Sequence, residues 1–280
     1  MKYNVRFPNL GIDLDINSIA ISFGNVKIYW YGVIIATGLL LAIMYAMKET
    51  KRYKISQDKL LNCVLVGIIT AIIGARLYYV VFSWDSYKDN PISILYINNG
   101  GLAIYGGIIG ALLGGGIMAK VQKMNVLAVL DIAMIGFLIG QGLGRWGNFM
   151  NQEAFGNVVP DNYLFGMISE GTGNKLVHPC FLYESVWCLL GVAFLHIFSK
   201  KFQRYYGQIF YIYLIWYGME RVVVEGLRTD SLYLPFKLFG ADIRVSQLLS
   251  GLCVIAGIIL LIINRKKHNF NVDVPEKIKT

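Results

Sequence analysis

Seven apolar stretches constrain this chain most strongly, because a helix of about twenty apolar residues spans the hydrocarbon core of a bilayer. They cover residues 28–47, 58–82, 102–121, 126–147, 181–199, 208–225 and 246–264. Hydrophobic residues make up 56% of the sequence and charged residues 15%, whereas soluble domains have roughly 25% charged residues. The sequence therefore predicts an all-α polytopic membrane protein with seven transmembrane helices, forming one integral membrane domain over residues 1–280.

Basic residues alternate between the loops and predict an orientation. Clusters of Lys and Arg follow the first, third, fifth and seventh stretches, such as Lys120 and Lys123 after the third. Since basic loops stay in the cytoplasm, the N-terminus is expected outside and the C-terminus in the cytoplasm. The outer loops then include residues 148–180. Residues 1–27 mix charged and apolar residues, so we expect no cleavable signal peptide.

The formal net charge of +9 does not indicate a nucleic-acid partner, because the basic residues concentrate in these short loops. The four cysteines are scattered without metal or redox spacing, and we interpret them as small core residues. They are Cys63, Cys180, Cys188 and Cys253. No His, Cys and Asp cluster has the spacing of metal ligands, so neither a metal nor a cofactor is predicted.

Several charged residues lie inside the apolar stretches or at their outer edge. The set is Arg76, Arg145, Glu184, Glu220, Arg221, Glu225 and Arg228. A charge at bilayer depth costs roughly 2.5–3.5 kcal/mol on insertion scales, so it needs a partner or a ligand. Tyr217, Arg221 and Glu225 are four residues apart and share one helix face. Two interpretations stay open: Arg and Glu pairs that hold helices together, and a functional site.

The run Gly144–Glu153 adds further polar groups at a membrane boundary. It contains Arg145, Asn148, Asn151 and Glu153. Together with the other arginines, its amides offer more hydrogen-bond donors than the carboxylates can use, which predicts an anionic ligand. At this depth the abundant anions are lipid phosphates, so we expect a cavity for a phospholipid head group at the outer side.

Glycine pairs at 100–101 and 106–107 flank Tyr105. Gly weakens a helix interior, so these pairs favour an unwound segment that lines a cavity. Gly110 and Gly114 are better explained by close helix packing. Separately, His178 is a candidate general base, with a purely structural role as the alternative.

The order of these motifs resembles the bacterial prolipoprotein diacylglyceryl transferases. The matching segments are Trp30-Tyr31-Gly32, Gly74-Ala75-Arg76, Gly100-Gly101-Leu102 with Gly106-Gly107, the run 144–153, His178-Pro179 with Leu182-Tyr183-Glu184, and Tyr217-Gly218 with Arg221 and Glu225. The resemblance implies an enzyme of the bacterial cytoplasmic membrane that moves a diacylglyceryl group from phosphatidylglycerol to the lipobox cysteine of a preprolipoprotein. This reaction releases glycerol phosphate and begins lipoprotein maturation.

The resemblance also implies a set of site residues. The expected phosphatidylglycerol ligands are Tyr31, Arg76, Arg145, Asn148, Tyr217 and Arg221, and the expected catalytic residues are Tyr105, Arg145, Glu153, His178, Arg221 and Glu225. Tyr105 stands where many members have a histidine, and a tyrosine with a pKa near 10 is a poor base. We therefore expect its hydroxyl to orient an oxygen of the lipid, while Glu153, Glu225 or His178 accepts the thiol proton. The alternative function is a lipid or small-anion transporter.

Overall fold

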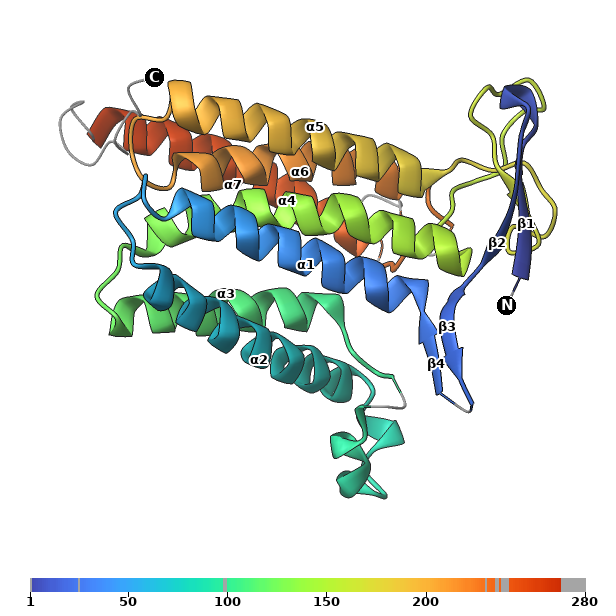
Figure 1. Ribbon diagram of the computed structural model, residues 1–280, viewed down its shortest axis with the longest axis horizontal. Coiled ribbons are helices and arrows are strands. Elements are labelled where there is room, and N and C mark those ends of the chain that lie inside the picture. The colour runs from blue at the N-terminus through green and yellow to red at the C-terminus, as the bar shows by residue number, and fades with distance from the viewer. Residues whose placement is uncertain are drawn as a thin grey trace. The chain divides into compact units, whose positions relative to one another are not determined.

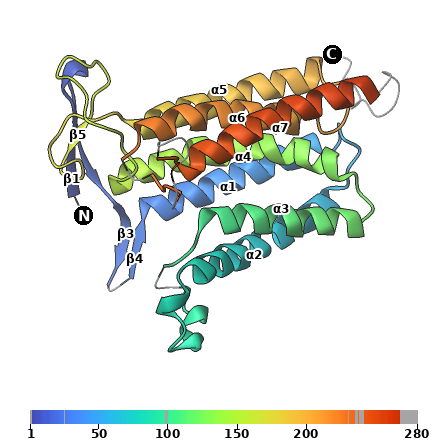
Figure 2. The ribbon, with the colours of Figure 1, turned by 180° about the vertical axis from the view of Figure 1, so that it is seen from behind.

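The computed structural model describes residues 2–24, 26–97, 100–229, 231–234, 237 and 242–267. Within these residues the chain forms seven α-helices, each overlapping one apolar stretch (Figures 1 and 2). They are α1 (Trp30–Glu49), α2 (Gln57–Phe82), α3 (Ile104–Val121), α4 (Val126–Asn151), α5 (Cys180–Lys201), α6 (Gln208–Leu227) and α7 (Val245–Lys267). The seven predicted helices are therefore confirmed as helices.

Six of the helices in the described part of the chain are long and apolar enough to cross a membrane. The chain is thus a multi-pass membrane protein. The remaining helix, α6, carries Glu220, Arg221 and Glu225, which interrupt its apolar sequence. A seventh crossing and the orientation of the termini stay predictions. The C-terminus itself lies outside the described residues.

The chain divides into two compact units. One unit combines residues 1–45 with 133–280, and the other covers residues 46–132. The first contains the start of α1, most of α4, and α5, α6 and α7, whereas the second contains α2 and α3. The single domain expected over 1–280 stays a prediction.

Short β-strands in the first unit are an addition that hydropathy does not predict. Strands β1 (Lys2–Phe7), β2 (Ile12–Asn17) and β5 (Ile168–Ser169) form an antiparallel sheet in the order β2-β1-β5. Strands β3 (Ile19–Phe23) and β4 (Val26–Tyr29) form a hairpin that leads directly into α1 (Figure 1). Strand β1 alternates buried and exposed side chains, as a half-buried strand does.

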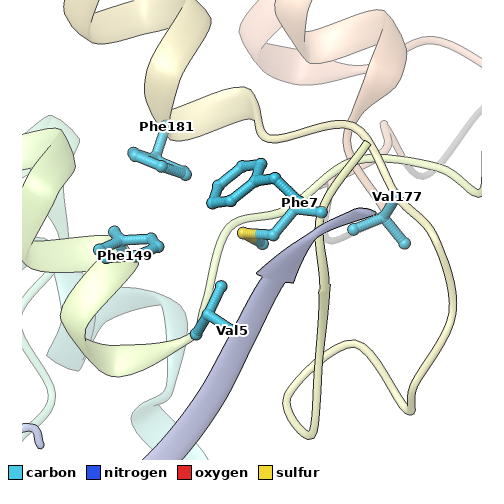
Figure 3. Close-up of a cluster of buried hydrophobic side chains, with 6 residues drawn as sticks. Val5, Phe7, Phe149, Val177 and Phe181 are labelled. Atoms are coloured by element: carbon cyan, nitrogen blue, oxygen red, sulfur yellow. The ribbon is translucent and has the colours of Figure 1, made fainter. Parts of the chain in front are cut away.

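A hydrophobic cluster attaches this sheet to the helices. Val5 and Phe7 of β1 lie beside Phe149 near the end of α4, Phe181 at the start of α5, and Val177 (Figure 3). The rings of Phe149 and Phe181 have centroids 4.7 Å apart. Because all of these side chains are buried, the sheet fixes the end of α4 and the start of α5. The polar run 144–153 lies at this end of α4.

In the second unit, α2 and α3 pack closely through small residues. A Cβ on Gly110 would lie 2.1 Å from the carbonyl oxygen of Thr70, and one on Gly114 would lie 2.1 Å from the Thr70 hydroxyl oxygen. The packing role predicted for both glycines is therefore confirmed. The unwound segment expected around Tyr105 is wrong for Gly106 and Gly107, which lie within α3. Gly106 instead serves close packing, because a Cβ there would lie 2.2 Å from the carbonyl oxygen of Gly74 on α2.

Candidate active site

Glu184 is the centre of a buried charged cluster in the first unit. Its side chain lies on the second turn of α5 and is 1% exposed. Arg145 of α4 forms an ion pair with Glu184 Oε2, and Nη1 of Arg221 on α6 lies 3.2 Å from the same oxygen. Nη1 of Arg228 lies 3.7 Å from Oε1. One carboxylate thus joins three guanidinium groups from separate segments.

The polar face predicted on α6 is formed as expected. Arg221 Nη2 lies 2.5 Å from Oε2 of Glu225, one turn later on the same helix. Two residues at the start of α7 hold the end of α6 in place. Arg244, just before α7, donates a hydrogen bond to the backbone carbonyl of Glu225, and Gln247, within α7, donates one to that of Val222. Arg221 therefore joins Glu184 and Glu225, and its position is fixed by both carboxylates.

The run 144–153 connects Arg145 to an exposed carboxylate. Arg145 Nη1 lies 3.4 Å from Oδ1 of Asn148, whose Nδ2 donates to Oε1 of Glu153 at 3.0 Å. Asn151 donates to the same oxygen at 3.3 Å. Helix α4 continues to Asn151, so the outer loop predicted at 148–180 begins four residues later than expected. The chain then reverses at Gln152, which has a φ of 56°, and this reversal places Glu153 beside Asn148.

The two tyrosines predicted as lipid ligands, Tyr31 and Tyr217, both belong to the first unit. The ring of Tyr31 packs against α4 at Gly147, where a Cβ would lie 2.8 Å from Tyr31 Cδ2. Tyr217 lies one turn before Arg221 and stacks on Tyr213, with ring centroids 5.8 Å apart and planes 1° apart. Tyr31 therefore packs against the helix that carries Arg145, and Tyr217 lies on the helix that carries Arg221.

His178 lies just before α5 in a short chain of hydrogen-bonding groups. Its Nδ1 is 3.2 Å from the hydroxyl of Tyr183, which is 2.9 Å from the hydroxyl of Tyr163. Burial lowers the pKa of His178, since desolvation disfavours the charged imidazolium. Burial therefore favours the neutral imidazole, in which one ring nitrogen can accept a proton.

Two of the predicted site residues belong to the second unit. The Arg76 guanidinium is buried on α2 and donates to backbone carbonyls at 2.7–3.4 Å. These carbonyls belong to Ser93, Ile94, Tyr96, Gly100 and Gly101. Tyr105 lies in the first turn of α3, with its ring centroid 6.4 Å from that of Tyr78. Arg76 thus orders the loop before α3, and its predicted role as a lipid ligand stays a prediction.

The sequence did not predict that Glu184 lies at the centre of the charged cluster. The sequence places it among the charged residues of the apolar stretches, but it was not among the expected site residues. Its partners come from α4 and α6, far away along the chain, so residue spacing carries no signal for the contact. A useful signal was the excess of arginines at this depth, because each of them requires a counter-charge.

The cluster suits an anionic ligand. Arg145, Arg221 and Arg228 each form an ion pair with a carboxylate. Their side chains are nevertheless 12–19% exposed, so they are not fully enclosed by the protein. A guanidinium has five N–H donors in a planar fork, and the carboxylate contacts use only part of them. The remaining donors match the geometry of phosphate oxygens.

Comparison with known proteins agrees with this chemistry. The family model for prolipoprotein diacylglyceryl transferase matches residues 18–263. The chain belongs to this family. A phosphatidylglycerol–prolipoprotein diacylglyceryl transferase of Bacillus mycoides (strain KBAB4) is 42% identical over 264 residues, covering 92% of this chain and 95% of the relative. Proteins of the same name from Bacillus cereus (strain G9842) and Bacillus cytotoxicus are 41% and 42% identical with the same coverage. The prolipoprotein diacylglyceryl transferase resemblance predicted from the motifs is confirmed.

Proposed function

We propose that this transferase moves the sn-1,2-diacylglyceryl group of phosphatidylglycerol to the lipobox cysteine thiol of a preprolipoprotein. The reaction forms a thioether, releases glycerol phosphate and is the first step of lipoprotein maturation. Family membership over most of the chain and the names of its relatives support the activity. The observation that carries the proposal is the convergence of Arg145 and Arg221 on Glu184, which presents guanidinium donors at a site built for an anion.

In this proposal Arg145 and Arg221 bind the lipid phosphate. Asn148 holds Arg145 on one side and Glu153 on the other, so it keeps the guanidinium in a fixed orientation. Tyr31 and Tyr217 border the same helices and contact the glycerol part of the head group. The ion pairs with Glu184 and Glu225 preorganise the arginines before the lipid arrives, which reduces the reorganisation needed on binding.

The chemistry requires a thiolate and a stabilised leaving group. A thiol with a pKa near 8.5 is only about 3% ionised at pH 7, so a proton acceptor is needed. The thiolate sulfur attacks the glyceryl carbon that carries the phosphate ester, and the bond between that carbon and oxygen breaks. Negative charge then grows on the leaving phosphate, where Arg145 and Arg221 stabilise it more strongly than in the bound lipid. Tyr105 belongs to the second unit, and its role in orienting an oxygen of the lipid stays a prediction.

We also propose seven membrane crossings in a bacterial cytoplasmic membrane, with the N-terminus outside and the C-terminus in the cytoplasm. Helix α6 crosses because its charged residues are buried against α4 and α5 instead of facing lipid. The alternation of basic loops supports the orientation. The charged cluster then lies towards the outer side, where the preprolipoprotein presents its cysteine.

A single mass measurement tests the proposal. Purified protein in phosphatidylglycerol liposomes is incubated with a lipobox peptide that contains one cysteine. We expect the peptide to gain the mass of a diacylglyceryl group, and Arg145→Ala and Arg221→Ala to abolish this gain. Arg6→Ala is the matched control, because Arg6 is exposed on β1. An unmodified peptide together with protein-dependent movement of phosphatidylglycerol between leaflets would instead support a transporter.

A further inference from the structure

Glu220 is a buried carboxylate that the proposed chemistry has not yet used. It lies on α6 and is 5% exposed. Neither Oε1 nor Oε2 has a hydrogen-bond partner among the described residues. Glu184 and Glu225, by contrast, each have a carboxylate oxygen paired with a guanidinium at 3.2 Å or closer. Three carboxylates thus lie at one site, and only one of them has neither a hydrogen bond nor an ion pair in the described part of the chain.

Glu220 directly precedes Arg221 on α6, so it lies next to the arginine cluster along the helix. The charged groups that act on it are Glu184 on α5, Arg145 on α4, Arg221 on α6 and Arg228 after α6. Cys188 on α5 also lies within electrostatic range. Helix α7, which packs on another face of α6, has no charged residue between positions 245 and 264. The polar environment of Glu220 is therefore the candidate active site itself.

An aromatic pair lies one turn away from Glu220 along α6. Trp216 lies one turn before Glu220 on the same helix face, and its ring stacks on Trp187 of α5 with centroids 4.6 Å apart. Each indole Nε1 donates to the backbone carbonyl of the other tryptophan, at 3.0 and 3.2 Å. Both indole N–H groups are used within this pair, so neither is available as a donor to Glu220.

A buried carboxylate without a partner is costly, because it loses hydration without gaining a hydrogen bond. An ionisable residue inside a membrane helix is therefore taken as a functional-site hypothesis by default. We propose that Glu220 accepts the proton of the acceptor thiol. This inference rests on the proposed transferase activity and adds the group that activates the nucleophile.

The proton and the electrons balance over the reaction. The carboxylate of Glu220 takes the proton from the cysteine S–H, which leaves a thiolate. The sulfur electron pair forms the new bond to the glyceryl carbon, and the electrons of the broken C–O bond leave with the phosphate. The glycerol phosphate that is released accepts the proton back from Glu220. The enzyme thus returns to its starting state without a co-reactant.

The other candidate acceptors are engaged more strongly. Glu225 is already held in an ion pair by Arg221. Glu153 accepts hydrogen bonds from two asparagine amides. Nδ1 of His178 is bonded to Tyr183. Glu220 alone combines burial, proximity to the arginine cluster and carboxylate oxygens without a hydrogen-bond donor in the described part of the site.

Substitution of Glu220 by glutamine tests the proposal, because glutamine keeps the size and polarity but cannot accept the proton. We expect Glu220→Gln to lower the transfer rate to a cysteine peptide by roughly 100- to 10,000-fold, with phosphatidylglycerol binding unchanged. The decisive substrate is the same peptide with selenocysteine in place of cysteine. A selenol is already ionised at neutral pH and needs no base, so we expect Glu220→Gln to react with it at nearly the wild-type rate.

Two further variants complete the test. Glu220→Asp is expected to keep most of the rate and the pH dependence of the wild type, and Glu170→Gln is the matched control, since Glu170 is exposed. A rate for Glu220→Gln within threefold of wild type on the cysteine peptide would overturn the proposal. Equal losses on the cysteine and selenocysteine peptides would overturn it too, because they indicate a structural role. If wild-type protein modifies neither peptide, the transferase activity itself is wrong.

Discussion

The two units of this protein each bury arginine in an apolar helix and satisfy it in different ways. Arg76 of α2 donates to five backbone carbonyls, which use both terminal nitrogens and Nε. Arg145 and Arg221 share the carboxylate of Glu184 and keep donors that the contacts do not use. A guanidinium saturated by carbonyls organises its own loop, whereas one held by a carboxylate is positioned and still able to bind an anion.

The difference in partners also changes the energetics. Backbone carbonyls carry no net charge, so the contacts of Arg76 leave its positive charge uncompensated and gain energy only from hydrogen bonds. The Glu184 cluster compensates charge with charge, but removal of Glu184 takes away the carboxylate that pairs with Arg145, and loss of one partner of a buried pair costs roughly 3–5 kcal/mol. Substitutions should therefore affect activity more strongly in the first unit and loop order more strongly in the second.

The largest effect is expected from lysine in place of Arg145 or Arg221. Lysine keeps the charge that Glu184 requires, but it loses the planar fork that binds a carboxylate and a phosphate together. We expect each variant to fold and to lose roughly 100- to 1,000-fold of the transfer rate, measured by mass spectrometry of the peptide. Arg6→Lys serves as the control. Near-normal rates in both variants would contradict a head-group role.

A smaller effect on activity is expected from Arg76→Ala. The substitution leaves the carbonyls of the loop before α3 without donors, at roughly 1–3 kcal/mol for each that stays buried. We expect faster hydrogen exchange at residues 93–97 and a rate loss of about tenfold. The phosphatidylglycerol concentration for half-maximal rate should not change. A large rise in that concentration would show that Arg76 is a lipid ligand, as its sequence motif predicts.

Two neighbouring glycines, Gly100 and Gly101, test whether Arg76 orders the loop before α3. Gly100 and Gly101 both have a positive φ, at +82° and +77°. A Cβ on Gly100 meets nothing within 4 Å, whereas one on Gly101 would lie 2.5 Å from Arg76 Nη1. We expect Gly100→Ala to lower the unfolding free energy by about 1 kcal/mol through backbone strain alone. Gly101→Ala should cost more and reproduce the exchange pattern of Arg76→Ala. Equal losses of unfolding free energy in Gly100→Ala and Gly101→Ala, measured by thermal denaturation, would contradict a specific contact between residue 101 and Arg76.

The helices and the polar face of α6 could be predicted from the sequence, because apolar length and a four-residue spacing are local properties. The convergence of Arg145, Arg221 and Arg228 on Glu184 could not, since it depends on how α4, α5 and α6 pack. Strand β1 was missed because Val5 and Phe7 alternate with polar residues and add little to hydropathy. The hydrogen bonds of Arg76 to the loop before α3 could not be predicted either, because backbone carbonyls leave no trace in residue types.

The smallest expected effect is a pH dependence of stability that arises from His178 and not from the charged cluster. Because burial lowers the pKa of His178, the unfolded chain binds a proton at a higher pH than the folded protein does. Between the two pKa values the unfolded state holds more protons, so stability rises with pH there and is lost as pH falls below about 6.5. We expect a small drop in melting temperature over this range, and a smaller one in His178→Gln. Identical pH dependence in both proteins would assign the titration to another group, whereas a matching change in transfer rate would make His178 part of the reaction.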